Sequence, residues 1–209
     1  MSNDTAQRIL DRAQALMVER GYNAFSYADI AEVVKVTKAS IHFHFATKAV
    51  LAEHVVRAYR EGVIAKLRQL SHQMPDAPVR LEAYARYWEN CISDNEPLCM
   101  CALLGSEILT LPDQVKSEVH AFFREVEAWL ASTLEEGVRQ GTLHPGHGPT
   151  LEAKSLLAVI YGAMLVARIF GDAAAFAAVA GDAIGRLKVA AQARTAKKTR
   201  MRAQAVSTR

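Results

Sequence analysis

The sequence predicts an all-α protein of about nine helices. Apolar residues recur at helical spacing along most of its 209 residues, and almost no stretch alternates apolar and polar residues as a half-buried strand would. Clusters of proline and glycine interrupt the helical stretches, which marks where helices end. The first helix is expected at about 5–20. Its apolar face consists of Ile9, Ala13, Leu16 and Met17.

The stretch that follows has the pattern of a helix-turn-helix. Ser26 stands where a helix should begin, and Asp29, three residues later, can complete a capping box. Lys35 and Val36 form the expected turn after that helix. Thr37 can then cap a second, short helix by accepting a hydrogen bond from an N–H of its first turn.

The second short helix is expected to have a buried and an outer side. Ile41 and Phe45 are four residues apart, so they share the buried side. The residues expected on or near the outer side are Lys38, Ala39, Ser40, His42, Phe43 and His44. Thr47 can cap a third helix, and Lys48 lies at the N-terminus of that helix.

This stretch resembles the signature of the TetR/AcrR family of transcriptional regulators. The residues that fit it in register are Gly21, Tyr22, Phe25, Ser26, Ile30, Ala31, Val36, Thr37, Ser40, Ile41, His44, Phe45, Lys48 and Leu51. Lys35 departs from the pattern, because glycine is usual at this turn. Its backbone therefore either avoids a positive φ or tolerates some strain. His42 also departs, because it replaces the usual tyrosine with a smaller, titratable ring.

The resemblance implies an N-terminal, three-helix DNA-binding domain at residues 1–50 and a larger helical body at 51–195 that binds an effector and dimerises. The helices expected beyond the head lie at about 48–71, 79–93, 99–111, 113–140, 151–170 and 173–192. The loops that contain Pro75, Pro97, Pro112 and Pro145 separate most of them.

The composition limits the class of protein. Hydrophobic residues make up 51% of the chain, which argues against global disorder. The longest strongly apolar run without charge, at 156–167, is shorter than the roughly 20 residues that cross a bilayer. No secretory signal is recognised at the start of the chain, and the 3 cysteines have no disulfide-framework spacing. We therefore expect a cytoplasmic protein with reduced thiols and no membrane partner.

The C-terminal end is basic. From Arg186 onward the chain carries lysines and arginines and no acidic residue, and residues 196–209 have almost no large apolar side chain. This tail is expected to be disordered. It is either a solubilising terminus or an accessory arm that binds phosphates.

Eight residues of the head are candidates for contact with double-stranded DNA: Ser26, Thr37, Lys38, Ser40, His42, Phe43, His44 and Lys48. Lys38, Ser40 and His44 can bond to base edges or phosphates in the major groove, and Phe43 can pack on a thymine methyl. Lys48 adds its charge to a helix N-terminus that already attracts phosphate. The alternatives are a solvated Lys48 and histidines that stack or cap inside the head.

The body contains candidates for an effector pocket. They are Tyr84, Trp88, Cys91, Leu104, Phe122, Val126, Trp129, Tyr161 and Met164. Tryptophan and tyrosine suit a flat apolar or aromatic effector. The same residues at helical spacing also fit a hydrophobic core. The sequence shows no catalytic motif and gives no reason to expect an enzyme, a cofactor or a metal.

Cys99 is a candidate redox or electrophile sensor. The segment around it resembles a subgroup of TetR regulators with a cysteine at the start of the sixth helix, followed by a pair that is Ser106-Glu107 here. A thiol in a first helical turn would have a lowered pKa. The alternative is a small buried hydrophobe. If Cys99 and Cys101 both lie on a helix, positions i and i+2 do not face each other, so a shared metal or an easy disulfide is not expected.

The last two helices are rich in alanine and glycine, which lets backbones approach closely. They are either buried within one subunit or form the four-helix interface of a homodimer, and the resemblance favours the interface. The sequence thus predicts a repressor that a small apolar or aromatic effector, or cysteine modification, releases from a palindromic operator. The alternatives are a cysteine-dependent helical enzyme and a non-responsive architectural DNA-binding protein.

Overall fold

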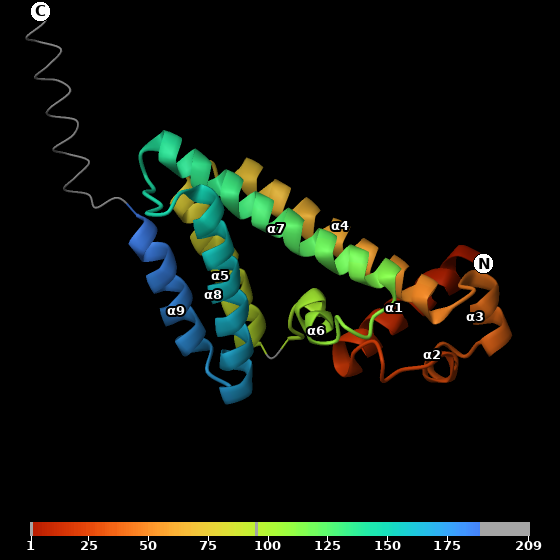
Figure 1. The fold of residues 1–209 in the computed structure, drawn as a ribbon. Helices are drawn as coiled ribbons and strands as arrows, with labels where there is room; N and C mark the ends of the chain where they lie inside the picture. Colours follow the sequence, from red (N-terminus) through yellow and green to blue (C-terminus); the bar gives the residue numbers. More distant parts are fainter. Residues whose placement is uncertain (1, 95, 189–209) are drawn as a thin grey trace, which may run out of the picture. The chain divides into compact units, whose positions relative to one another are not determined.

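The computed structural model describes residues 2–94 and 96–188, and nine α-helices lie in them (Figure 1). The helices are α1 (Ser2–Arg20), α2 (Tyr27–Val34), α3 (Lys38–His44), α4 (Lys48–Gln73), α5 (Ala77–Ser93), α6 (Met100–Ser106), α7 (Asp113–Gln140), α8 (Pro149–Phe170) and α9 (Ala173–Leu187). Within the same residues, β pairing is limited to one isolated bridge between Leu143 and Lys188. The predicted all-α class is confirmed, and the predicted basic tail at 196–209 lies outside the described residues.

The chain divides into two compact units. Among the described residues, the first unit comprises 2–69, 91–94 and 96–126, and the second comprises 70–90 and 127–188. The long helices α4 and α7 contribute to both. The predicted DNA-binding head, 1–50, falls in the first unit, where α1, α2, α3 and α6 pack together. In the second unit α8 and α9 lie side by side (Figure 1).

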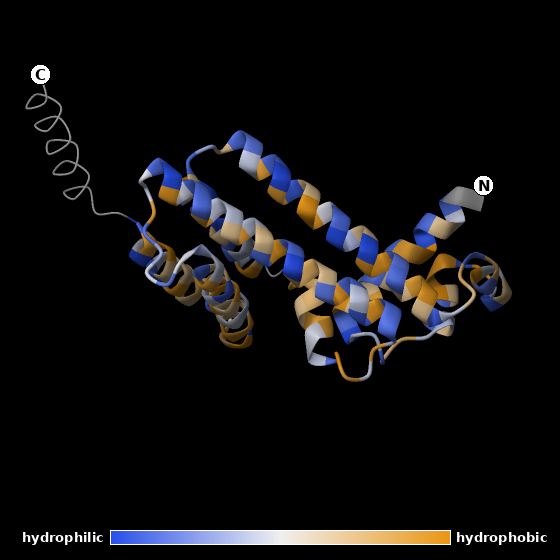
Figure 2. Cartoon of the chain, turned by 45° about the horizontal axis from the view of Figure 1, so that its top comes forward, coloured by the Kyte–Doolittle hydropathy of each residue, from blue (hydrophilic) through white to orange (hydrophobic). Residues whose placement is uncertain are grey.

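The core of the first unit follows the apolar pattern of the sequence. The predicted inner face of α1, formed by Ile9, Ala13, Leu16 and Met17, is fully buried. Ile30, Ile41 and Leu51 bring one buried side chain each from α2, α3 and α4. Figure 2 shows polar residues on the other sides of these helices. The hydrophobic effect therefore fixes which face of each helix points inward.

An ion-pair network joins α4 to α7 in the first unit. Glu118, whose side chain is 13% exposed, accepts hydrogen bonds from Arg57 Nε at 3.0 Å and Arg60 Nε at 2.9 Å. Arg60 also bonds to Glu125 at 2.6 Å. Burial raises the pKa of Glu118, but the two arginines outweigh burial and hold the pKa below its ordinary value. The pairing therefore stabilises the fold above the unfolded-state pKa of this carboxyl and is lost as pH falls through the lower, folded-state pKa.

The sixth helix is shorter than the sequence predicts. We expect it from Cys99 to Leu111, whereas α6 spans Met100–Ser106. The chain after it closes through i→i+3 hydrogen bonds, from Glu107 N to the Leu104 carbonyl at 3.0 Å and from Thr110 N to the Glu107 carbonyl at 2.9 Å. These tighter turns replace the α-helical pattern and set the residues after α6 in a compact corner.

Arg80 organises the second unit. It lies on α5, its side chain is 3% exposed, and it bonds to Glu136 on α7 at 2.8 Å. It also donates to the carbonyls of Met74 at 2.9 Å and of Ser71 and Pro75 at 3.4 Å. One guanidinium thus satisfies the end of α4, the following loop and a carboxylate of α7.

One helix of the described residues, α8, is long and apolar enough to cross a bilayer by length and composition alone. Only 28% of its most apolar window is buried within this single chain. Most of the apolar surface of this window is therefore not covered by the rest of the chain.

We predict that Arg80→Ala lowers the free energy of unfolding by about 3 kcal/mol, because it removes the ion pair of the buried guanidinium with Glu136 and its hydrogen bonds to the Met74 and Ser71 carbonyls. Urea denaturation followed by circular dichroism measures this. The matched control is Arg86→Ala, an exposed arginine on the same helix, which should change stability by less than about 0.5 kcal/mol. Equal effects of the two substitutions would contradict the role assigned to Arg80.

Candidate nucleic-acid interface and effector site

The predicted capping box at the start of α2 is present. Ser26 Oγ accepts a hydrogen bond from Ala28 N at 3.2 Å, and Asp29 Oδ2 accepts from Ser26 N and Ser26 Oγ at 2.7 Å each. The Ser26 hydrogen bonds are the main reason why the pKa of Asp29 is lowered. The exposed Ser26 hydroxyl thus fixes the start of α2, and it remains accessible to a DNA phosphate.

The turn between α2 and α3 carries backbone strain. Lys35 adopts the left-handed conformation, with φ 62° and ψ 45°, so of the two possibilities the chain tolerates strain here. Its N–H bonds to the Ala31 carbonyl at 3.0 Å, and Arg8 Nη2 bonds to the Val34 carbonyl at 2.8 Å. These two bonds satisfy carbonyls at the end of α2 and hold the non-glycine residue in place.

The two sides of α3 are as predicted. Thr37 Oγ1 caps the helix by accepting from Ser40 N at 3.1 Å. Ile41 and Phe45 are buried. The outer residues Lys38, Ala39, His42 and Phe43 are exposed, and Ser40 and His44 are partly exposed. The Phe43 ring is 83% exposed, which places a large apolar group in water on a polar helix face.

The two histidines of α3 differ in their surroundings. His42 Nδ1 lies 3.1 Å from the Ala46 carbonyl, and its ring packs at 4.7 Å from the ring of Tyr27. Tyr27 in turn donates its hydroxyl to the Phe45 carbonyl at 2.8 Å. His42 therefore makes contacts inside the head. This agrees with the alternative interpretation, in which His42 stacks on or caps other residues of the head. His44 lies against the ring of Phe43 at 5.4 Å.

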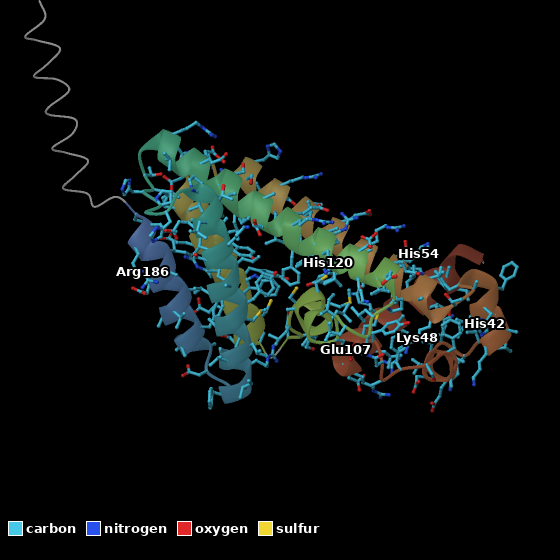
Figure 3. All side chains as sticks on the ribbon, in the orientation of Figure 1. His42, Lys48, His54, Glu107, His120 and Arg186 are labelled. Atoms are coloured by element: carbon cyan, nitrogen blue, oxygen red, sulfur yellow. The ribbon has the colours of Figure 1, made fainter. Side chains whose placement is uncertain are left out.

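Lys48 is held at the N-terminus of α4 (Figure 3). Its ammonium donates to the Phe25 carbonyl and lies 4.3 Å from the centre of the Phe25 ring and 4.6 Å from that of Tyr22. Burial lowers the pKa of Lys48, and the carboxylates of Glu107 and Asp29 oppose this. An ammonium has three donors, so this lysine can hold the Phe25 carbonyl and still reach a phosphate.

The second unit contains a cluster of aromatic side chains. Tyr84 lies 5.3 Å from Trp129 and 6.4 Å from Trp88, measured between ring centres. Trp88 also lies 6.1 Å from Tyr161 and 5.0 Å from Tyr87. The indole N–H of Trp88 is buried and has no hydrogen-bond acceptor among the described residues. A buried donor of this kind is costly, and a bound acceptor would relieve the cost.

The predicted pocket residues fall into both units. Tyr84, Trp88, Trp129, Tyr161 and Met164 belong to the second unit. The others, Cys91, Leu104, Phe122 and Val126, belong to the first unit and are buried there. The aromatic cluster of the second unit is therefore the part of the predicted site that the structure brings together.

The thiols of Cys99 and Cys101 interact through a hydrogen bond. The sequence predicts Cys99 within the sixth helix, and this placement is wrong: Cys99 is the N-cap of α6, with φ −51° and ψ 117°, so the helical i, i+2 argument does not apply to this pair. The Cys99 hydrogen bond and burial raise the pKa of Cys101, with Arg60 and Glu118 close enough to affect it. Both thiols are buried.

Two further features bear on the site. Within residues 2–94 and 96–188, no three His, Cys, Asp or Glu side chains are grouped as metal ligands. A recess of about 390 Å³ lies in the second unit and was not predicted. Its polar lining comes from His144, Glu152, Ser155 and Arg186. In the sequence, only His144 in the loop before α8 could have pointed to this recess, and helical periodicity does not show where loop residues lie.

Comparison with known families gives two matches along the chain. Residues 9–55 match the bacterial regulatory proteins of the tetR family. Residues 77–181 match the tetracyclin repressor-like C-terminal domain, which includes α8. The apolar α8 is thus part of a domain type that these regulators share.

Individual proteins agree with this assignment. A TetR-family transcriptional regulator from Agrobacterium tumefaciens is 42% identical, with a TM-score of 0.87 over 90% of this chain and 100% of its own. The repressor NemR of Escherichia coli K12 is 25% identical over 80% of this chain and 85% of NemR. The nucleoid occlusion factor SlmA of Marinobacter nauticus is 27% identical over 54% of this chain, and the match spans 58% of SlmA.

We predict that Lys35→Gly raises the free energy of unfolding by about 0.5–1 kcal/mol, because glycine adopts the left-handed conformation without the steric cost that Lys35 bears. Urea denaturation measures the change. The same substitution at Lys38, in the first turn of α3, should lower stability by about 0.5–1 kcal/mol. A loss of stability at Lys35 would show that the turn is not strained.

Proposed function

The chain belongs to the TetR family of bacterial regulatory proteins, and from this premise we propose that it is a sequence-specific DNA-binding transcriptional repressor. The observation that carries the proposal is the outer face of α3, where the 83% exposed Phe43 lies among Lys38, Ser40 and His44. An apolar ring beside hydrogen-bonding groups matches the mixture of thymine methyls and polar base edges in the major groove. Phe43 is too exposed to contribute to the hydrophobic core.

The remaining head candidates would position the protein on the DNA backbone. Ser26, Thr37 and Lys48 lie at helix starts, where hydroxyls and an ammonium can bond to phosphate oxygens. His42 is the weakest candidate, because its ring already packs on Tyr27. In this division of roles, backbone contacts set the register and the α3 face reads the bases.

A homodimer through α8 and α9 would present two α3 helices to a palindromic operator. The support is a set of exposed apolar side chains on these two helices: Leu151, Leu165, Val166, Ile169, Phe170 and Val179. Figure 2 shows α8 and α9 as largely apolar. A second copy of the chain would cover this surface, and two-fold symmetry would match the symmetry of the DNA site.

The effector would be a flat apolar or aromatic compound with at least one hydrogen-bond acceptor. The aromatic cluster around Tyr84, Trp88 and Trp129 supplies the rings, and the buried Trp88 N–H supplies an unsatisfied donor. Binding there would lower operator affinity through a coupling of about 1–3 kcal/mol.

Modification of Cys99 is the second candidate for the signal. Cys99 and Cys101 are hydrogen-bonded to each other, and Cys101 lies near Arg60 and Glu118, the residues that join α4 to α7. A group added to this buried pair would disturb the network that holds α4, the helix that begins at the DNA-binding head.

The proposed function is tested on DNA that flanks the gene of this protein. Footprinting should find a two-fold symmetric site whose half-site centres lie about 10 base pairs apart or a multiple of that. Protection of a single, asymmetric half-site by a monomer would contradict the proposal.

Lys48→Ala and His44→Ala should affect DNA binding differently. Loss of the Lys48 charge should weaken binding to all sequences and reduce the slope of log K against log salt by about one, and loss of its bond to the Phe25 carbonyl should weaken binding to all sequences further by loosening the head. His44→Ala should instead reduce discrimination at one base position by about 1–3 kcal/mol. Fluorescence anisotropy on operator and random DNA at several salt concentrations measures both, with circular dichroism as the folding control. Equal losses on the two DNAs for both variants would refute this division.

Val166→Glu should convert the dimer to a monomer and abolish operator binding, because it would bury an unpaired charge at a cost of several kcal/mol. Sedimentation equilibrium measures the mass. Val138→Glu on α7 is a control with similar exposure and the same new charge. A dimeric Val166→Glu variant with normal DNA binding would place the interface elsewhere.

The thiol candidate has its own test. N-ethylmaleimide should release operator DNA from the wild-type protein and from Cys91→Ser, and not from Cys99→Ser. Mass spectrometry confirms which thiol has reacted. If Cys99→Ser releases DNA as fully as wild type, Cys99 serves packing alone and the non-covalent effector remains as the signal.

A further inference from the structure

We propose that Glu107 holds the DNA-binding head on α6, and that this contact is the point at which α6 sets the DNA affinity of the head. The inference rests on the proposed function and adds a positioning residue to it. The contact, which we call the Glu107 junction, comprises Gly21, Tyr22 and Asn23 of the head with Glu107 and Thr110 after α6. All five residues lie in the first unit.

Two hydrogen bonds form the junction. Tyr22 N donates to Glu107 Oε2 at 2.7 Å, and Asn23 Nδ2 donates to Thr110 Oγ1 at 2.8 Å. Thr110 N also bonds to the Glu107 carbonyl at 2.9 Å, so both acceptors stand on one turn. The corner between α1 and α2 is therefore attached to a single, short segment of the body.

Gly21 makes room for the carboxylate. It ends α1 with φ +77°, and a Cβ at this position would lie 2.3 Å from Glu107 Oε1 and 2.8 Å from Glu107 Cδ. The carboxyl group thus packs directly against the Gly21 backbone. Any larger residue at position 21 would have to push Glu107 away from Tyr22.

Lys48 completes the charge balance of the junction. Its ammonium bonds to the Phe25 carbonyl and lies over the rings of Phe25 and Tyr22, while the Glu107 carboxylate accepts a hydrogen bond from the Tyr22 N–H. The segment from Tyr22 to Phe25 is thereby held by a carboxylate and an ammonium. The same ammonium stands at the N-terminus of α4, where we place a DNA phosphate contact.

The backbone of Glu107 is tied to the end of α6. It is the C-cap of that seven-residue helix, and its N–H bonds to the carbonyls of Leu104 and Gly105. Met100, Cys101 and Leu104 anchor α6 in the core. A carboxylate at a helix C-terminus is unfavourable with respect to the helix dipole, so stability of α6 itself does not explain a glutamate here. A displacement of α6 would carry Glu107 with it and loosen the head.

Hydrogen exchange and DNA binding together test the junction. In the DNA-free protein, Glu107→Ala should speed exchange of the Tyr22 amide at least about tenfold, because that N–H loses its acceptor. The same variant should bind operator DNA about tenfold more weakly, because the head is no longer held in one position. Glu107→Gln keeps an acceptor without the charge, so the slow exchange of the Tyr22 amide and the affinity for operator DNA should both be partly retained. The variant Asp113→Asn removes the charge of an exposed carboxylate on α7 and controls for the change in net charge.

A double-mutant comparison isolates the contact itself. Gly21→Ala should speed Tyr22 exchange in the wild-type background both by displacing Glu107 and by straining the backbone at φ +77°, and in the Glu107→Ala background only the second effect should remain. The proposal is overturned if Glu107→Ala leaves the exchange rate of the Tyr22 amide unchanged, or if the effects of Gly21→Ala and Glu107→Ala on that rate are fully additive. It is also overturned if operator affinity falls only in proportion to a loss of folded protein. If the wild type binds no symmetric DNA site, the proposed function fails, while the exchange experiment still decides whether Glu107 holds the head.

Discussion

The geometry of the DNA-binding head depends on how the Phe25 carbonyl, between α1 and α2, is satisfied. Its partner is the Lys48 ammonium, which comes from α4 and is stabilised by two aromatic rings. Burial lowers the pKa of Lys48 below its ordinary value, and the nearby carboxylates of Glu107 and Asp29 offset part of this effect. The start of α4, the corner after α1 and the start of α2 are therefore linked through one charge.

The same helix continues this arrangement into the body. Beyond Lys48, α4 presents Arg57 and Arg60 to Glu118 and Glu125 of α7. The buried thiol of Cys101 lies close enough to Arg60 and Glu118 for its pKa to respond to them. Ion pairs and hydrogen bonds along α4 thus connect the head, at Lys48, to α7, at Glu118 and Glu125.

Exposed apolar surface has two different meanings in this chain. Phe43 stands alone among polar groups on α3, as expected for a group that contacts a mixed polar surface such as DNA. The side chains on α8 and α9, such as Val166 and Ile169, form a set on two adjacent helices, as expected for a protein partner. The composition of α8 also satisfies the length and hydropathy criteria of a membrane helix, and its place in a TetR-type C-terminal domain favours the protein partner.

The sequence by itself determined the all-α class, the caps at Ser26 and Thr37 and the buried side of α3, because these follow from local hydrogen bonding and from the 3.6-residue period. It could not determine the conformation of Lys35, since propensity allowed two outcomes, or the end of α6, where i→i+3 turns replace the helix. It also placed Cys99 on the helix, and the structure moved it to the N-cap beside Cys101. The hydrogen bond from Tyr22 N to Glu107 joins residues 85 positions apart. Only tertiary packing decides such a contact, because no local pattern in the chain records which carboxylate reaches which backbone N–H.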